Sequence, residues 1–285
     1  MQGDLRFDRT LEDVGTIVEF GHVNLRVPDQ RLATIFYVTG MGFTRDPYLV
    51  TGVDNMWINV GTTQFHLPTG PAQVLGGTIV VAVPNLAGLA SRLSRVASLL
   101  AETRFTHHAV TDAIHVTCPW GNRLRCIEGT SPRLGIVAVE IHTPPGTAAG
   151  IAAFYRTIFA APSIQGGHGV SVPVGLHSQL IFHETDETLA PFDGAHIQIA
   201  LSDFSGPHAR LLERGLITEE SSQHQYRFHD IVDLQTGAVL CQIEHEVRSM
   251  RHPMFARALI NRDPEVTNAA YATGREVLVL GAEPA

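Results

Sequence analysis

Histidine is the residue type with the greatest capacity for chemistry in this sequence, since fifteen occur among 285 residues. A neutral imidazole is the commonest metal ligand in proteins, so a metal site is the first hypothesis. In residues 21–27 apolar and polar side chains alternate, which is typical of a half-buried strand and places His22 on the polar face. Residues 62–67 place His66 in the same way. A single strand histidine is nevertheless more often a hydrogen-bonded structural residue than a ligand.

Other polar groups carry weaker signals. His107 and His108 are neighbours on a predicted strand, so their side chains point to opposite faces and cannot chelate one ion together. The glycine-rich run 166–169 is not followed by Lys-Ser or Lys-Thr, which argues against a phosphate-binding loop. Residues 224–229 alternate as a strand does, and Tyr226 is a candidate substrate contact on one of its faces.

An internal repeat organises the chain. The pair Phe36-Tyr37 recurs as Phe154-Tyr155, and several further matches follow in order at a nearly constant offset. Such regular self-similarity indicates a duplicated domain. We predict one copy at residues 17–130 and a second at 136–246, with a C-terminal tail, 247–285, that packs on the two domains.

Each copy divides again into two units with a strand, a helix and further strands. In copy one we predict strands near 21–27, 55–60, 62–67, 78–83, 113–118 and 123–128, and helices near 30–39 and 86–98. In copy two we predict strands near 137–143, 179–183, 196–201, 226–232 and 238–244, and helices near 148–158 and 204–214. The chain is therefore predicted to contain four β-α-β-β-β units.

This pattern resembles the vicinal oxygen chelate superfamily, which includes glyoxalase I, fosfomycin- and bleomycin-resistance proteins and extradiol ring-cleavage dioxygenases. The residues that carry the resemblance are 21–29, Phe36-Tyr37, 40–43 and 119–122, and it extends over residues 17–246. It implies an α+β fold of two tandem domains, each a pair of units forming an eight-stranded half-barrel. The superfamily hosts many reactions on one scaffold, so the fold alone does not define the reaction.

The resemblance also implies where metal ligands lie, because members of the superfamily take them from the first and last strands of each unit. In copy one these positions hold His22, His66, Thr78 and Glu128. Two imidazoles and a carboxylate suit Fe²⁺, Zn²⁺, Mn²⁺ or Ni²⁺, with positions left for a chelating substrate. Thr78 departs from the pattern. No general base stands out beyond the ligands themselves, so Glu128 is also the candidate catalytic residue.

Copy two offers a weaker candidate site. The matching positions hold His183, His196 and Glu244, whereas the first-strand position holds Ala138. Glu140 lies on the same strand face as Ala138 and could substitute for the missing ligand. We therefore favour copy one as the metal site.

Three functions remain open at this point. Tandem domains look most like the dioxygenase arrangement, which favours Fe²⁺ and a ring-cleavage or 2-oxo-acid dioxygenase-like reaction on a substrate chelated through adjacent oxygens. A glyoxalase-type lyase or isomerase is the alternative if the metal is not iron. A metal-free small-molecule binding protein is the third, because Thr78 and Ala138 each remove a ligand.

The composition indicates which partners and which cellular compartment to expect. The net charge of −8 and a pI near 6.0 argue against a nucleic-acid binder. Three cysteines cannot form a disulfide framework, which suggests a reducing compartment. We see no signal peptide and no apolar run long enough to span a bilayer. We expect a soluble, cytoplasmic protein with a small-molecule substrate and no nucleic-acid or membrane partner. Superfamily members often pair, which makes a homodimer a further expectation.

Overall fold

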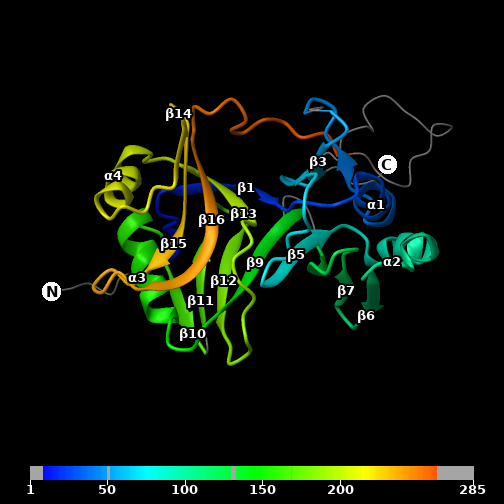
Figure 1. Ribbon diagram of the computed structural model, residues 1–285, viewed down its shortest axis with the longest axis horizontal. Coiled ribbons are helices and arrows are strands. Elements are labelled where there is room, and N and C mark those ends of the chain that lie inside the picture. The colour runs from blue at the N-terminus through cyan, green and yellow to red at the C-terminus, as the bar shows by residue number, and fades with distance from the viewer. Residues whose placement is uncertain (1–8, 50–51, 130–132, 168, 262–285) are drawn as a thin grey trace.

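The fold is known from a computed structural model, which describes residues 9–49, 52–129, 133–167 and 169–261. In that part of the chain two eight-stranded mixed sheets carry four α-helices (Figure 1). The predicted α+β class and the construction of each sheet from a pair of β-α-β-β-β units are confirmed. No helix within the described ranges is long and apolar enough to cross a membrane.

The first sheet, sheet 1, has eight strands in the order β14 (Glu219–Ser222), β15 (Gln225–Val232), β16 (Val239–Ser249), β13 (His196–Leu201), β1 (Ile17–Asn24), β4 (Thr63–Pro68), β3 (Asn55–Val60) and β2 (Thr44–Arg45). Sheet 2 has the order β10 (Ile164–Gly166), β11 (Gly169–Pro173), β12 (Gln179–Glu184), β9 (Gly135–Thr143), β5 (Gly77–Val83), β8 (Arg123–Glu128), β7 (Ala113–Thr117) and β6 (Thr106–Ala109).

The helices follow the first strand of each unit. They are α1 (Gln30–Ala33), which continues as the π-helical segment η2 (Thr34–Gly40), α2 (Leu86–Val96) with the 3₁₀ turn η3 (Ala97–Leu100), α3 (Ala148–Phe159) and α4 (Ser205–Glu213); a further 3₁₀ turn, η1 (Arg9–Glu12), precedes β1. Side chains cap two of these helices, since Asp29 accepts hydrogen bonds from the N–H groups of Arg31 and Leu32, and Asn85 from that of Gly88.

The units pair across the repeat rather than within it, and this corrects one expectation. Strand β1 of the first unit pairs antiparallel with β13 of the fourth, and β5 of the second unit pairs with β9 of the third. Residues 17–130 and 136–246 therefore each supply half of both sheets. The sequence repeat could not reveal this, because four similar units have the same strand patterns whichever partner each one finds.

Each copy nevertheless forms its own helical lobe. Figure 1 shows α1 and α2 together at one end of the molecule and α3 and α4 together at the other. The repeated aromatic pairs explain this, because they fill the core of each lobe. Tyr37 lies 5.1 Å from Phe65 between ring centroids in one lobe, and Tyr155 lies 5.7 Å from Phe182 in the other. All four rings are buried, so the lobes form the core and the two sheets connect them.

Glycine permits the close approach of the central strands. A Cβ on Gly21 of β1 would lie 1.8 Å from Oε1 of Gln198 on β13, and a Cβ on Gly77 of β5 would lie 1.8 Å from the carbonyl oxygen of Glu140 on β9. The side chain of Gln198 is buried and the Glu140 atom belongs to the backbone, so neither can move aside freely. A larger residue at either glycine would therefore separate the strands. Gly21 directly precedes His22, and Gly77 directly precedes Thr78, so each glycine is next to a predicted ligand position of its strand.

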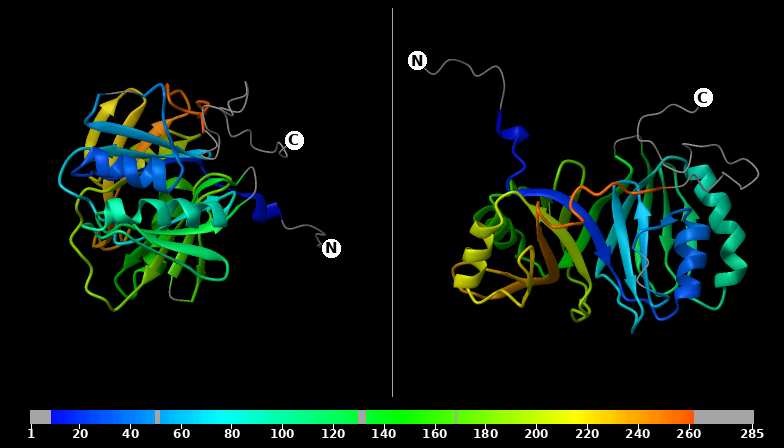
Figure 2. Two further views of the ribbon diagram at one scale, coloured as in Figure 1. Left: turned by 90° about the vertical axis from the view of Figure 1, so that its right-hand side faces the viewer. Right: turned by 90° about the horizontal axis from the view of Figure 1, so that it is seen from above.

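Residues 250–261 cross sheet 1 from one lobe to the other. The segment leaves the end of β16 and runs over to β2 and β3, as Figures 1 and 2 show in orange. Asn59 of β3 donates a hydrogen bond to the carbonyl oxygen of Ile260, and Asn261 donates one to that of Gly61, both at 2.8 Å. Nη2 of Arg257 lies 2.5 Å from Oδ2 of Asp46. This segment, the strap, therefore fastens copy two to copy one.

The Arg257–Asp46 pair gives a stability prediction. Burial alone would raise the pKa of Asp46, but Arg257 and two backbone N–H groups hold it below the ordinary value of 3.8. Arg257→Met should therefore lower the free energy of unfolding by about 1–3 kcal/mol at pH 7, because a buried carboxylate loses its main partner. Urea denaturation measures this.

The pH dependence and a control sharpen the test. A depressed pKa contributes stability that is present near neutral pH and is lost as the pH falls below 3.8. The difference between wild type and Arg257→Met should therefore shrink in acid. Arg251→Met, which changes an exposed side chain of the strap, should have little effect. Equal destabilisation by both variants would contradict the assigned role of the pair.

Candidate metal centre

Three histidines from three strands meet on sheet 1. His22 comes from β1, His66 from β4 and His196 from β13, and each offers a ring nitrogen within 4.8 Å of those of the other two. The ring centroid of His22 lies 5.8 Å from that of His66 and 5.7 Å from that of His196. Among the histidine, cysteine, aspartate and glutamate side chains of the described residues, these three histidines form the cluster that could hold a metal ion.

Strand register explains why these histidines meet. Val23 lies opposite Ile197 near one end of the contact between β1 and β13, and a local two-fold axis through this pair maps His22 onto His196. His66 lies on β4 beside Asn24, two residues beyond His22. By the same relation, Glu246 lies on β16 beside Gln198, two residues beyond His196. The register therefore defines a fourth position, and a glutamate occupies it.

The orphaned nitrogen atoms fit a metal ion. Nε2 of His22, of His66 and of His196 are all buried without a hydrogen-bond partner. His22 is 1% exposed and His196 is 7% exposed. A buried polar atom without a partner costs free energy, and these three belong to a group whose donor atoms lie close enough together to hold a metal ion. Three imidazoles with a carboxylate nearby are suitable ligands for Fe²⁺, Mn²⁺, Ni²⁺ or Zn²⁺.

Burial keeps two of the imidazoles neutral, as metal binding requires. Removal from water is the largest cause that lowers the pKa of His22 well below 6.5. It also lowers the pKa of His66 to about 3, with further lowering from nearby His196. Trp57 contributes to this environment, because its ring stacks on His66 at 3.9 Å between centroids and meets His22 edge-on at 4.9 Å.

Glu246 lies between two arginines. Nη2 of Arg227 is 2.5 Å from its Oε2, Nη2 of Arg248 is 2.6 Å from its Oε1, and Nε2 of His196 is 3.5 Å from its Oε2. Burial would raise the pKa of this carboxyl group, but His196 and the two guanidinium groups hold it well below the ordinary value. The carboxylate is therefore ionised and available, although the arginines compete with a metal ion for its oxygens.

Not every buried histidine of the sheet belongs to this centre. Nδ1 of His245 donates to the carbonyl oxygen of Ile243 at 2.8 Å, and its Nε2 then accepts from the hydroxyl group of Tyr155 at 2.8 Å. Its ring stacks on Phe228. Burial lowers its pKa to about 4, so it is a neutral structural residue with both nitrogens satisfied.

The structure separates Glu128 from His22 and His66. Glu128 ends β8 in sheet 2, whereas the two histidines lie in sheet 1. Its side chain points to the same face of β8 as the buried side chains of Leu124 and Cys126, but it is exposed because it lies at the end of the strand. The expected set from copy one is therefore not assembled, because the units pair across the repeat.

The second candidate set is also divided. His196 joins the cluster, and Glu244 lies beside it on β16, bonded to Arg227 and 3.4 Å from Nδ1 of His196. His183 is exposed on β12, and Glu140 lies on β9, both in sheet 2. Tyr226 packs on the helix side of β15, 4.9 Å from His208 of α4 between ring centroids, and does not reach the histidines.

Sequence reasoning missed Glu246. Counting from the preceding glycine turn matched Glu128 with Glu244. In the structure Glu244 lies beside His196 and Arg123 lies beside Thr78, so the residue equivalent to Glu244 is Arg123. Strand β16 has eleven residues and β8 has six, so counting from the turn shifts the alignment. The available signal was the alternation of polar side chains along β16, which places Glu246 on the same face as Glu244.

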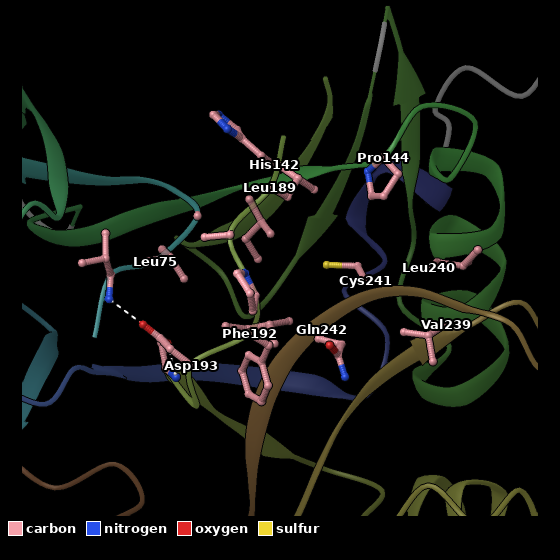
Figure 3. Close-up of a pocket in the computed structure, with 17 residues that line it drawn as sticks. Leu75, His142, Pro144, Leu189, Phe192, Asp193, Val239, Leu240, Cys241 and Gln242 are labelled. Atoms are coloured by element: carbon pink, nitrogen blue, oxygen red, sulfur yellow. Dashed lines mark hydrogen bonds between the residues drawn. The ribbon is translucent and has the colours of Figure 1, made fainter. Parts of the chain in front are cut away.

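A separate hollow of about 260 Å³ lies beside the start of β16 (Figure 3). Leu75, Leu189, Phe192 and Cys241 line it, and Asp193 at its edge accepts a hydrogen bond from the backbone N–H of Val74. Burial raises the pKa of Cys241 to about 12, so its thiol stays protonated. None of the three clustered histidines lines this hollow.

Comparisons with known proteins identify the fold. No protein-family model matches the sequence, and neither does any curated protein. Glyoxalase I from Zea mays superposes with a TM-score of 0.57 at 11% identity, over 85% of this chain and 95% of that one. A Bacillus subtilis protein described provisionally as a dioxygenase gives a TM-score of 0.53 at 14% identity, over 84% of this chain and 87% of that one. The chain therefore has the vicinal oxygen chelate fold that the sequence motifs predicted.

Metal content tests the centre directly. Protein incubated with Fe²⁺, Mn²⁺, Ni²⁺ or Zn²⁺ and then desalted should retain about one ion per chain, as elemental analysis measures. His22→Ala and His196→Ala should each lose most of it, because the remaining donors no longer surround the ion. Glu128→Ala and His183→Ala are the matched controls and should retain it. Loss in the Glu128 variant with retention in the His196 variant would support the set from copy one instead.

Proposed function

We propose that the protein is a metal-dependent enzyme of the vicinal oxygen chelate type, and that it moves a proton on a small substrate held through two adjacent oxygens. This is a glyoxalase-type isomerase or lyase activity. The observation that carries the proposal is the four-position set of His22, His66, His196 and Glu246, defined by strand register. A bound divalent ion would act as a Lewis acid toward the two substrate oxygens.

The number of protein donors favours proton transfer over oxygen chemistry. Three imidazoles and one carboxylate fill four positions of a six-coordinate ion, which leaves two for the substrate oxygens. A dioxygenase of the 2-His-1-carboxylate kind needs a further open position for O₂. This order of preference is the reverse of that expected from the sequence, since the tandem layout alone favoured a dioxygenase.

The residues around the centre suit an anionic reaction intermediate. Arg227 and Arg248 place two positive charges beside the centre, where they pair with Glu244 and Glu246. Positive groups fixed in a buried site stabilise negative charge that develops on substrate oxygens, and they do so without reorganisation of water. Glu246 is the candidate proton acceptor because its carboxylate is ionised and lies 3.5 Å from Nε2 of His196. The charged partners that hold its pKa low also weaken it as a base.

A dioxygenase is the second candidate, and one observation favours it. Both arginines hold the carboxylate of Glu246, so that group does not have to bind the ion. Three histidines alone would leave three positions, enough for a chelating substrate and O₂. The metal-free binding protein considered from the sequence is supported less, because Nε2 of His22 and Nε2 of His66 would then stay buried without a hydrogen-bond partner.

Two measurements on metal-loaded protein distinguish these functions. With 2-hydroxyacetophenone in D₂O, NMR should detect exchange of the protons next to the carbonyl group, and His196→Ala should abolish it. Glu246→Gln should slow the exchange by about a hundredfold, as expected when a general base is lost, and Glu128→Gln is the matched control. With catechol under air, an oxygen electrode should detect no consumption. Oxygen uptake that His196→Ala abolishes would establish the dioxygenase instead, and no activity in either assay would contradict both.

A further inference from the structure

Sheet 2 carries the structural counterpart of the proposed metal centre, and its chemistry is different. Ile79 lies opposite Val139 in the contact between β5 and β9, as Val23 lies opposite Ile197 in sheet 1. The same register rules then map His22 onto Thr78. The other three positions map onto Ala138, Arg125 and Ile181. None of these side chains is a common ligand for a divalent ion, and a guanidinium group is always protonated in proteins.

A cavity occupies this counterpart position. Its volume is about 630 Å³, and it is lined by three of the four mapped residues, Arg125, Ala138 and Ile181. Clefts of about 300–1,000 Å³ commonly hold small molecules. Apolar and polar side chains share its walls. The apolar part includes Val80, Ala82, Ile127, Val137 and Leu176, and the polar part includes Glu128, Arg133, His177, Ser178 and Gln179.

Arg125 is one of three charged residues that line this cavity, together with Glu128 and Arg133. Its side chain is 36% exposed, and its Nη2 lies 2.6 Å from Oε1 of Glu140. That bond uses one of the five N–H donors of a guanidinium group, so donors remain for a second acceptor. Arg123, two residues earlier on the same strand face, and Arg133 at the edge add positive charge, against Glu128 at the edge and Glu140.

We propose that sheet 2 carries a second, metal-independent binding site, and that it takes an apolar small molecule bearing one carboxylate. The carboxylate binds Arg125, which a planar guanidinium group favours through paired hydrogen bonds. The apolar body lies against Val80, Ala138 and Ile181. This site lies in a different sheet from the proposed catalytic centre, so it does not depend on the proposed function.

Isothermal titration calorimetry of the full chain, stripped of metal with EDTA, tests the site. The probe is 1-naphthylacetate, with the neutral 1-naphthylacetamide as its matched control. The carboxylate should bind saturably with one site per chain, and the amide should bind at least about tenfold more weakly, because a charge-assisted hydrogen bond is lost.

Two variants of the ion pair should change the affinity in opposite directions. Arg125→Gln should weaken binding of 1-naphthylacetate about tenfold or more. Glu140→Gln should strengthen it several-fold, because it frees the guanidinium group from a competing carboxylate. A general loss of fold cannot produce both effects. His22→Ala should bind the probe as wild type does, since His22 lies in the other sheet.

Several outcomes would overturn the proposal. These are the absence of saturable binding to wild type, equal binding of the amide, and unchanged binding by Arg125→Gln. Loss of binding in His22→Ala would move the probe to sheet 1. All of these outcomes are distinguishable from failure of the proposed function, which is measured on the metal-loaded protein with other substrates.

Discussion

The antiparallel contact between β1 and β13 is the constraint on which the site depends. These strands are separated by most of the chain in sequence, yet Val23 lies opposite Ile197 in the ladder. That register brings His22 and His196 to 5.7 Å between ring centroids. Because side chains alternate along a strand, a slip of one residue would turn one of the histidines to the helix side. The irregularities in the register of β1, and the absence of a side chain at Gly21, allow the two strands to approach closely at this point.

Burial determines the electrostatics of the centre. Imidazoles can be buried at modest cost when neutral, whereas a buried carboxylate needs charged partners. Arg227 and Arg248 are those partners for Glu246, and they allow an ionised acid to lie at 3% exposure. The same contacts oppose transfer of the carboxylate to a metal ion. The balance between the arginines and the ion therefore determines how many donors the protein supplies, and with it how many positions remain for substrate and O₂.

The sequence predicted the class of fold and its four units, because those depend on local alternation and on the repeat of Phe36-Tyr37 as Phe154-Tyr155. It also placed His22, Thr78, Ala138 and His196 at matching first-strand positions, and these residues lie on the strands β1, β5, β9 and β13. It could not predict which units pair, since that depends on contacts between distant strands. The same limit explains why Glu128 was grouped with His22 and His66, and why Glu246 was missed.

The two sheets show how little sequence separates a metal centre from a different kind of cavity. One backbone arrangement carries histidines and a glutamate in sheet 1, and threonine, alanine, arginine and isoleucine in sheet 2. Among the described residues, the proposed metal centre lies in sheet 1, so the free energy of metal binding there would stabilise the fold through that sheet. Both sheets, however, are shared by the same two lobes, and the strap fastens those lobes on the side of sheet 1. An ion held by His22 and His66 from one copy and His196 from the other would link the copies, and so would also oppose separation of β5 from β9 in sheet 2.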